Sequence, residues 1–276
     1  MANEKDIALR RILVALDVSE QSRAALESAA RLAAGLQAEL VGLFVEDSEL
    51  LQIAELPVSR LVGPGGIAAL DAALLRRAFK VQAAEARRAL EATAERWQVK
   101  SSFQVTRGAA AEVVVAEASH FDLVALGRTS RPGGRRAPLG ATARHAARTA
   151  SCSVLVSRSG KRAGCPVMVV FEGDERPLGL AAALSGIYSC RLLIQILESD
   201  DAAAGKLAAR AKAWLEERGL PGQISRLESS DAMALRQAVL QADCGLLLLD
   251  RQGPQVSQLD LDLLLEDQDT PVLLLR

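Results

Sequence analysis

Aromatic side chains are scarce in this sequence of 276 residues, which contains only five Phe, two Trp and one Tyr. That scarcity argues against a protein that binds single-stranded nucleic acid by stacking bases on aromatic rings. An excess of charge is also missing, since 33 Lys and Arg stand against 34 Asp and Glu. The net charge of −1 therefore gives no reason to expect DNA or an anionic membrane surface as a partner.

Metal-ligating residues and long apolar segments are lacking as well. The two histidines, His120 and His145, are far apart, and no two cysteines form a C-x-x-C pair, so no metal site is expected. The first residues are acidic where a signal peptide would be basic and then apolar. No apolar segment approaches the roughly 20 residues that cross a bilayer. We therefore expect a reduced, cytoplasmic protein. Its cysteines are Cys152, Cys165, Cys190 and Cys244.

What the first half does contain is an alternation of strand and helix patterns. Unbroken apolar segments indicate strands buried on both faces of a sheet, and regular alternation indicates a further strand. Ser19 and Ser22 are candidate N-caps of the first helix, and Gly35 is its expected end. The strands are predicted at 11–17, 40–45, 102–107, 122–127 and 153–156. The helices are predicted at 24–33, 68–97, 111–119 and from about 140.

The same order of patterns begins again after a linker at 157–164. This repetition predicts an α/β fold with two consecutive Rossmann-like, open, parallel, five-stranded sheets, each with helices on both faces. We predict one domain at 1–159 and a shorter one at 160–276, which lacks a counterpart of residues 46–80. The strands of the second copy are predicted at 166–171, 191–197, 223–228, 245–249 and 271–275.

Ligands of such folds bind at the carboxyl ends of the strands, near the point where the strand order reverses. Asp17, Val45 and Gly127 lie at three of those ends. A loop rich in glycine and arginine follows Gly127, and six arginines but no acid lie between 127 and 150. Gly140 then opens a helix, whose free N–H groups favour an anion. The pattern indicates a phosphate site. Alternatively, the loop is an ordinary turn and the arginines form a solvated face.

Several motifs in the same order resemble the universal stress protein family in its tandem form. They span the first half and, more weakly, the second, and the resemblance implies a stress-response protein that binds ATP or AMP in its first domain, with or without Mg²⁺. It also implies that Asp17 faces the adenine and ribose, and that the Val45 main chain contacts the adenine edge. The motifs lie at 12–26, 107–108, 122–127 and 152–156.

Some members of that family bind ATP through the pattern Gly-x2-Gly-x9-Gly-Ser/Thr. Here it falls on Gly127, Ser130, Gly140 and Ala141, so two of four positions match. Ser130 adds a side chain where the pattern has glycine. Ala141 lacks the hydroxyl of the Ser or Thr in the pattern, and two alternatives are open: the neighbouring Thr142 supplies that hydroxyl, or no residue does. Losing one hydrogen bond to a phosphate costs about 1.5–3 kcal/mol, which weakens binding without abolishing it. The nucleotide-binding candidates are Asp17, Val45, Gly127, Arg128, Ser130, Gly140, Ala141 and Thr142.

The second half lacks the phosphate loop of the family. Asp250 and Gln258 stand where the first and third glycines of the pattern would stand, and Asp260 and Asp262 lie at the helix start. Carboxylates there compete with a phosphate for the same amides and repel it. The second domain is therefore not expected to bind ATP in the manner of the family.

The small net charge conceals a difference between the halves. Residues 1–159 carry 21 basic and 17 acidic side chains, a balance of +4, and residues 160–276 carry 12 and 17, a balance of −5. Members of the family pair through their fifth strands. By that resemblance, 153–156 and 272–275 pair within this chain as a pseudo-dimer, which either stays a monomer or forms a homodimer. The basic loop and the acidic segment would then lie close together.

A catalytic site is not indicated by any motif in the sequence, which contains no G-x-S-x-G, H-E-x-x-H or paired-carboxylate pattern. Cys152 is expected in the core and His145 on the surface or in packing, so that at most slow ATP hydrolysis is left open. The alternative function is a nucleotide-independent universal stress protein that acts as an interaction scaffold for an unidentified protein. Residues 46–80 would then be a partner surface or a lid, or would simply cover the sheet.

Overall fold

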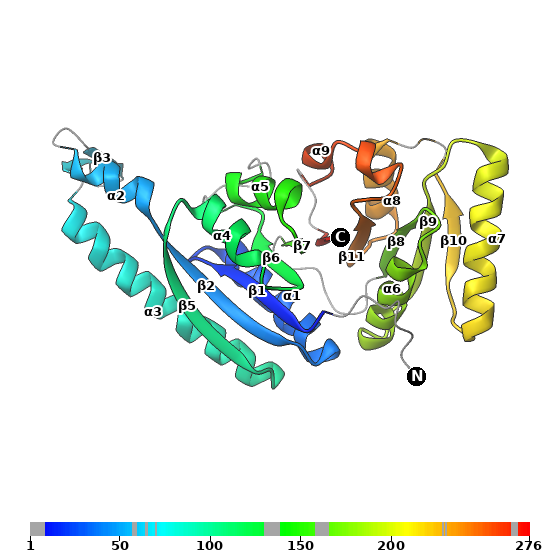
Figure 1. The fold of residues 1–276 in the computed structure, drawn as a ribbon, viewed down its shortest axis with the longest axis horizontal. Helices are drawn as coiled ribbons and strands as arrows, with labels where there is room; N and C mark the ends of the chain where they lie inside the picture. The colour runs from blue at the N-terminus through cyan, green and yellow to red at the C-terminus, as the bar shows by residue number, and fades with distance from the viewer. Residues whose placement is uncertain are drawn as a thin grey trace.

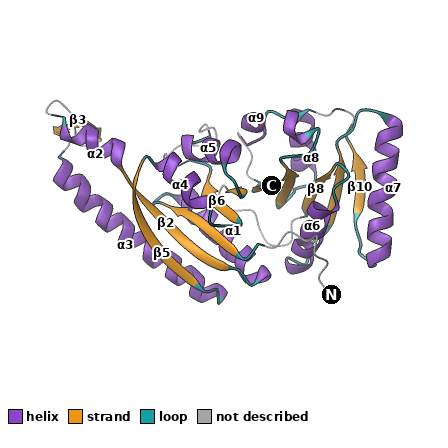
Figure 2. Cartoon of the chain, in the orientation of Figure 1, coloured by secondary structure: helices purple, strands orange, loops and turns teal. Residues whose placement is uncertain are grey.

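The structure, a computed structural model, describes residues 9–56, 60–63, 66–69, 71–129, 139–157, 166–227, 229, 231–265 and 270–276. Helices and strands alternate along both halves (Figures 1 and 2). The first half comprises β1 (Arg11–Leu16), α1 (Glu20–Leu36), β2 (Glu39–Asp47), α2 (Ser48–Glu55), β3 (Arg60–Gly63), β4 (Gly66–Ala69), α3 (Ala72–Trp97), β5 (Ser101–Gly108), α4 (Ala110–Ala118), β6 (Leu123–Gly127), α5 (Ala141–Thr149) and β7 (Ser153–Ser157).

The second half repeats this series without α2 and the β3–β4 hairpin among its described residues. Its elements are β8 (Val167–Phe171), α6 (Glu175–Ile187), β9 (Leu192–Ile196), α7 (Asp201–Arg218), β10 (Gln223–Arg226), α8 (Ala232–Gln241), β11 (Leu246–Asp250), the 3₁₀ turn η1 (Val256–Gln258), α9 (Leu261–Leu265) and β12 (Val272–Leu275).

The ten main strands form one hydrogen-bonded sheet in the order β10-β9-β8-β11-β12-β7-β6-β1-β2-β5. Pairing is parallel within each half and antiparallel between β12 and β7, where Leu273 lies opposite Leu155. The predicted α/β fold is confirmed, and so is the pairing of the fifth strands. The two sets of five strands are not separate sheets, however, because that pairing joins them edge to edge.

Two apolar layers, one on each face of the sheet, run across both halves. Successive strand residues alternate between them, as Ile12 and Leu13 do. Helices α1, α3, α6 and α7 cover one face, and α4, α5, α8 and α9 cover the other. Aliphatic residues supply most of both layers, in keeping with the scarcity of aromatics. The boundary predicted at 159/160 lies outside the described residues, and the division into two domains stays a prediction.

Two sequence predictions about helices were wrong. The helix predicted at 68–97 begins at Ala72, because Gly66–Ala69 pairs with Arg60–Gly63 as a hairpin. Helix α1 does not end at Gly35 but continues to Leu36, and Gln37 takes the left-handed conformation at φ 54°. Gly35 has a packing reason instead, since a Cβ there would lie 2.5 Å from the Cγ2 atom of Ile187. Ser19 is confirmed as the N-cap, accepting a hydrogen bond from the Ser22 amide.

Side chains of opposite charge meet where the halves join. The Asp262 carboxylate in α9 lies 2.7 Å from a guanidinium nitrogen of Arg148 and 3.2 Å from one of Arg144, both in α5. The predicted closeness of the basic and acidic regions is confirmed for these residues, while residues 130–138 lie outside the described part. Arg251 also spans the junction, donating at 2.8–3.1 Å to three main-chain carbonyls of the first half, those of Ala147, Ala150 and Cys152.

Candidate functional site

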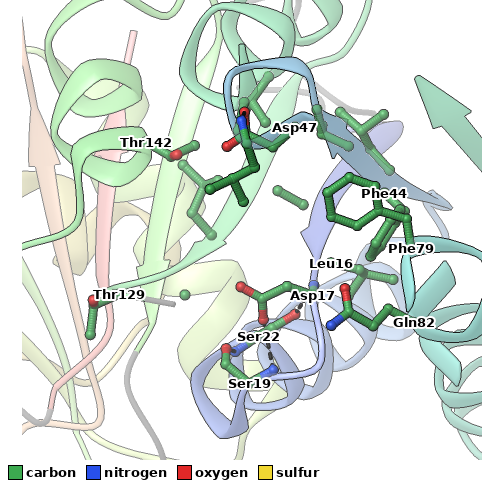
Figure 3. A pocket seen from close by; sticks show the side chains of 18 residues that line it. Leu16, Asp17, Ser19, Ser22, Phe44, Asp47, Phe79, Gln82, Thr129 and Thr142 are labelled. Carbon is green, nitrogen blue, oxygen red and sulfur yellow. Dashed lines mark hydrogen bonds between the residues drawn. The ribbon is translucent and has the colours of Figure 1, made fainter. Parts of the chain in front are cut away.

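A cavity of about 240 Å³ lies at the carboxyl ends of β1, β2 and β6. It is bounded by the β1–α1 connection, the end of β2, the residues after β6 and the start of α5, with α3 closing one side (Figure 3). Of the sequence-predicted site residues, the structure brings four together here: Asp17, Val45, Gly127 and Thr142. The residues between them are mostly apolar: Ala15, Leu16, Leu43, Phe44, Leu50, Phe79, Ala110, Val114 and Leu126.

Asp17 is held in place by the first turn of α1. Its carboxylate accepts a hydrogen bond from the Ser19 amide at 2.8 Å, and its own amide donates to the Ser22 hydroxyl at 2.9 Å. The Ser22 amide in turn donates to the Ser19 hydroxyl at 3.1 Å. Both serines line the cavity beside Asp17 (Figure 3). These short-range bonds fix the position of the carboxylate at the cavity before any ligand arrives.

Gly127 is required by packing, independently of any ligand. A Cβ at this position would lie 2.9 Å from the main-chain carbon of Gln21 and 3.0 Å from the Ser22 nitrogen. Backbone cannot yield as a flexible side chain can, so the strand end and the start of α1 approach this closely only with glycine between them. The next turn is fixed by the Gln21 side chain, whose Oε1 accepts a hydrogen bond from the Thr129 amide at 2.8 Å.

Three other predicted residues that the structure describes, Arg128, Gly140 and Ala141, are not among those that line the cavity. Arg128 is buried, with 1% of its surface exposed. Gly140 is the N-cap of α5, and its amide donates to the Arg128 carbonyl at 2.8 Å. A Cβ on Gly140 would come within 3.2 Å of that carbonyl oxygen, so packing also explains this glycine. Ala141 is exposed at the start of α5. Ser130 lies outside the described residues.

Sequence reasoning missed several residues of the cavity wall. Phe44 and Phe79 contact each other edge to face, with ring centroids 6.4 Å apart, and Gln82 lies one turn further along α3. Asp47 ends β2 and caps α2, accepting from the Glu49 amide at 2.9 Å. An acid two residues after the strand predicted at 40–45 was the available signal for Asp47. No local signal places α3, because its packing against β2 is a tertiary contact.

The described lining of the cavity is acidic rather than basic. It includes the carboxylates of Asp17 and Asp47 but no Lys or Arg. Of the basic residues in the loop that follows β6, Arg128 is buried and does not line the cavity, and Arg131, Arg135 and Arg136 lie outside the described part of the chain. Polar recognition by the described lining therefore comes from two carboxylates, four hydroxyl residues and the Gln82 amide. The hydroxyl residues at the two ends of the cavity are Ser19, Ser22, Thr129 and Thr142.

The corresponding place in the second half is filled by an acidic side chain. Glu172 follows β8 as Asp17 follows β1, and its Oε1 accepts hydrogen bonds from the amides of Gln255 and Val256 at 2.5 and 3.2 Å. Burial raises the pKa of Glu172, and the nearby Asp250 and Glu198 carboxylates raise it further. At the start of α9, the Asp260 carboxylate accepts from the Asp262 amide at 3.0 Å, as the acidic sequence predicted.

Two further residues considered for chemistry, Cys152 and His145, lie in the core and on the surface respectively. Cys152 is buried, and its thiol lies 3.2 Å from the Ser153 carbonyl oxygen. Burial raises the pKa of the Cys152 thiol, which disfavours the reactive thiolate. His145 is exposed on α5. Among the described residues, no group of three His, Cys, Asp or Glu side chains is placed to hold a metal ion. In the same part of the chain, no helix is long and apolar enough to cross a membrane.

Comparison with known proteins agrees with this geometry. The model of the universal stress protein family matches residues 8–158, which include every element of the cavity. A universal stress protein of Archaeoglobus fulgidus has the same overall fold, with a TM-score of 0.74 and 13% identity over 99% of this chain and 98% of its own. A Pseudomonas aeruginosa protein described as a universal stress protein gives a TM-score of 0.60 and 13% identity, over 99% and 95%. No curated protein matches the sequence.

Proposed function

The chain belongs to the universal stress protein family, and from that premise we propose that it is a stress-response regulatory protein whose first half binds an adenine nucleotide, ATP or AMP. We further propose that residues 1–159 form the nucleotide-binding domain and residues 160–276 a diverged domain without that activity. The binding residues are those that line the cavity, with Arg128, Ser130, Gly140 and Ala141 contributing from the adjoining loop and helix start.

The observation that supports nucleotide binding is the meeting of Asp17, Val45, Gly127 and Thr142 at one cavity from four separate elements. Its volume, about 240 Å³, is slightly below the roughly 300–1,000 Å³ of typical ligand pockets. The cavity therefore suits the base and sugar, while the phosphates extend towards the loop after β6 and the start of α5. The apolar wall that contains Phe44 would cover the base.

A magnesium ion fits this proposal only as a companion of the nucleotide. Mg²⁺ prefers oxygen ligands, keeps several waters and commonly binds through one or two carboxylates together with substrate phosphates. Asp17 and Asp47 are the carboxylates that line the cavity among the described residues. Both already accept hydrogen bonds from helix-capping amides, so the protein alone provides no ready cage for the ion.

Calorimetric titration with ATP and AMP tests the proposal, and two aspartates give a matched pair of variants. Asp17 and Asp174 both accept a hydrogen bond from the amide two residues ahead, at 2.8 and 3.0 Å, but only Asp17 lines the cavity. Asp17→Ala is expected to weaken binding by about tenfold or more. Asp174→Ala should bind like the unchanged chain. A chain that takes up neither nucleotide at millimolar concentration would refute the proposal.

The second candidate function, a nucleotide-independent interaction scaffold, has one specific observation in its favour. The segment of α2, the β3–β4 hairpin and the first turn of α3 projects from the body of the first half (Figure 1). It exposes large apolar side chains, at 45% for Leu50, 47% for Ile53, 56% for Leu56 and 59% for Leu74. Such a patch is typical of a protein-binding surface. Protein purified with bound adenine nucleotide, seen as excess absorbance at 260 nm, would favour the first function over this one.

The proposal also covers the assembly and location of the chain. Because β7 and β12 already pair, the pseudo-dimer is complete within one chain and needs no second copy. We therefore propose a monomer, to be checked by light scattering against the chain mass of 29.3 kDa. The thiol of Cys152 is free and buried, and we propose a reducing, cytoplasmic location for the chain.

A further inference from the structure

Each half has a side chain near its beginning that reaches the loop after its fourth strand, from the first turn of α1 in the first half and from the residue after β8 in the second. In the first half, Oε1 of Gln21 accepts a hydrogen bond from the Thr129 amide at 2.8 Å. In the second half, Oε1 of Glu172 accepts from the amides of Gln255 and Val256. The two contacts begin at different positions, α1 in the first half and the residue after β8 in the second, but both end in the loop after the fourth strand. The accepting oxygen is neutral in Gln21 and belongs to a carboxyl group in Glu172.

The Glu172 carboxylate fills its loop closely. A Cβ added to Gly253 would overlap this carboxylate, so glycine at that position leaves room for the carboxylate where it lies. Its Oε2 is buried and has no hydrogen-bond partner among the described residues. Two successive main-chain amides directed at one negative oxygen are the arrangement by which loops hold anionic ligands. Glu172 thus occupies the place that the oxygen of an external anion would take.

We propose that Glu172 is a built-in anion that closes the second-half loop to external anions, whereas Gln21 is a neutral counterpart that a phosphate oxygen can displace in the first half. The first-half part of this inference rests on the proposed function. Gln21 is then a specificity-determining residue, because it decides whether the loop after β6 accepts negative charge.

The difference follows from the strength and sign of the two interactions. Hydrogen bonds to a charged oxygen are roughly twice as strong as those between neutral groups. A phosphate oxygen therefore competes well with the Gln21 carboxamide for the Thr129 amide. In the second half, a phosphate oxygen would have to replace hydrogen bonds that the Glu172 carboxylate already accepts. It would also have to approach the carboxylates of Glu172, Asp250 and Glu198, and the last two already raise the pKa of Glu172 by their charge.

Hydrogen exchange at the amides of Gln255 and Val256 tests the second half. Glu172→Ala removes the carboxylate, and exchange at these amides should become about tenfold faster or more. Glu172→Gln keeps an acceptor of the same shape and should remain protected. Millimolar inorganic phosphate should slow exchange in the alanine variant and leave the unchanged chain as it is. Equal exchange in the unchanged chain and the alanine variant, or no effect of phosphate on that variant, would overturn the proposal.

Titration with ATP and with uncharged adenosine tests the first half. Gln21→Glu places a carboxylate as the second half does, and should lower ATP affinity by about tenfold or more, equivalent to about 1.4 kcal/mol. The affinity for adenosine, which carries no phosphate, should fall far less in the same variant. Gln21→Ala removes the competing oxygen and should bind ATP more tightly. ATP affinity that is unchanged by Gln21→Glu would overturn the specificity role of Gln21.

The two arms separate failure of this inference from failure of the proposed function. If the unchanged chain binds neither ATP nor adenosine, nucleotide binding and the role of Gln21 both fall. The exchange experiment needs no nucleotide and still decides whether Glu172 acts as the built-in anion. The remaining outcome is that the unchanged chain binds ATP, but the Gln21 variants bind it equally well and the Glu172 variants exchange at the rate of the unchanged chain. In that case the proposed function stands and the inference fails.

Discussion

The Asp262 carboxylate of the second half lies 2.7 Å from the Arg148 guanidinium of the first, on the face of the sheet where α5 and α9 meet. Arg251 of the second half donates hydrogen bonds to three main-chain carbonyls that are close to Arg148 in the sequence. The junction therefore combines a partly exposed ion pair with a cluster of hydrogen bonds from a half-buried guanidinium. These two kinds of contact should differ greatly in their contribution to stability.

We expect Arg251→Met to lower the free energy of unfolding by about 2–4 kcal/mol, because it leaves carbonyls of the first half without their charged donor. Arg148→Ala removes a pair in which the arginine is 58% exposed, and should cost no more than about 1 kcal/mol. Urea unfolding measures both. Equal losses in the two variants would show that the Arg251 hydrogen bonds do not hold the junction.

Two helical glycines are expected to respond in opposite directions to the same substitution. In Gly35→Ala the new Cβ would lie 2.5 Å from Ile187, and overpacking of about 1–3 kcal/mol should outweigh the better helix propensity. Gly205 in α7 has no atom within 4 Å of such a Cβ, so Gly205→Ala should stabilise by about 0.5–1 kcal/mol. Thermal unfolding measures both, and shifts of the same sign would contradict the packing of α1 against α6.

Glu172 should make stability depend on pH. Burial raises the pKa of this carboxyl, so between its ordinary range and the raised value the folded chain holds a proton that the unfolded chain releases. Its contribution to stability is therefore lost as pH rises through that window. Glu172→Gln removes the titration, and the stability of this variant relative to the unchanged chain should increase from pH 4 to pH 7. Unfolding free energies at the two pH values measure this.

A suitable control for that measurement is Glu91→Gln, which removes one exposed charge from α3. It gives the change in stability that follows from net charge alone. A difference between Glu172→Gln and the unchanged chain that stays constant with pH would contradict the raised pKa of Glu172.

The strand and helix order was predictable from the sequence because it rests on local patterns. The unbroken apolar segments became buried central strands, and Ser19 capped its helix through a neighbouring amide. The errors arose where a distant contact overrode a local signal. Gly35 looked like a helix end but is small because Ile187 packs on it, and the hairpin at 60–69 replaced the start of a long helix.

The candidate site was only partly predictable for the same reason. Asp17, Val45 and Gly127 follow from the rule that parallel strands end at one edge. Thr142 follows from the resemblance to the family pattern, and all four residues line one cavity. Phe79 could not be assigned to it, because nothing in the sequence around 79 shows which strand α3 covers.

By itself, the sequence determined the repeated α/β pattern, the edge of the sheet at which the cavity lies and the opposite charges of the two halves, since each is carried by residue type and local spacing. Tertiary structure alone decided that the ten strands form one sheet and that Gln21 and Glu172 reach their loops. The Gln21–Thr129 contact joins residues 108 positions apart, and the Glu172–Gln255 contact joins residues 83 apart. Packing sets such distant contacts, and periodicity within a segment does not encode them.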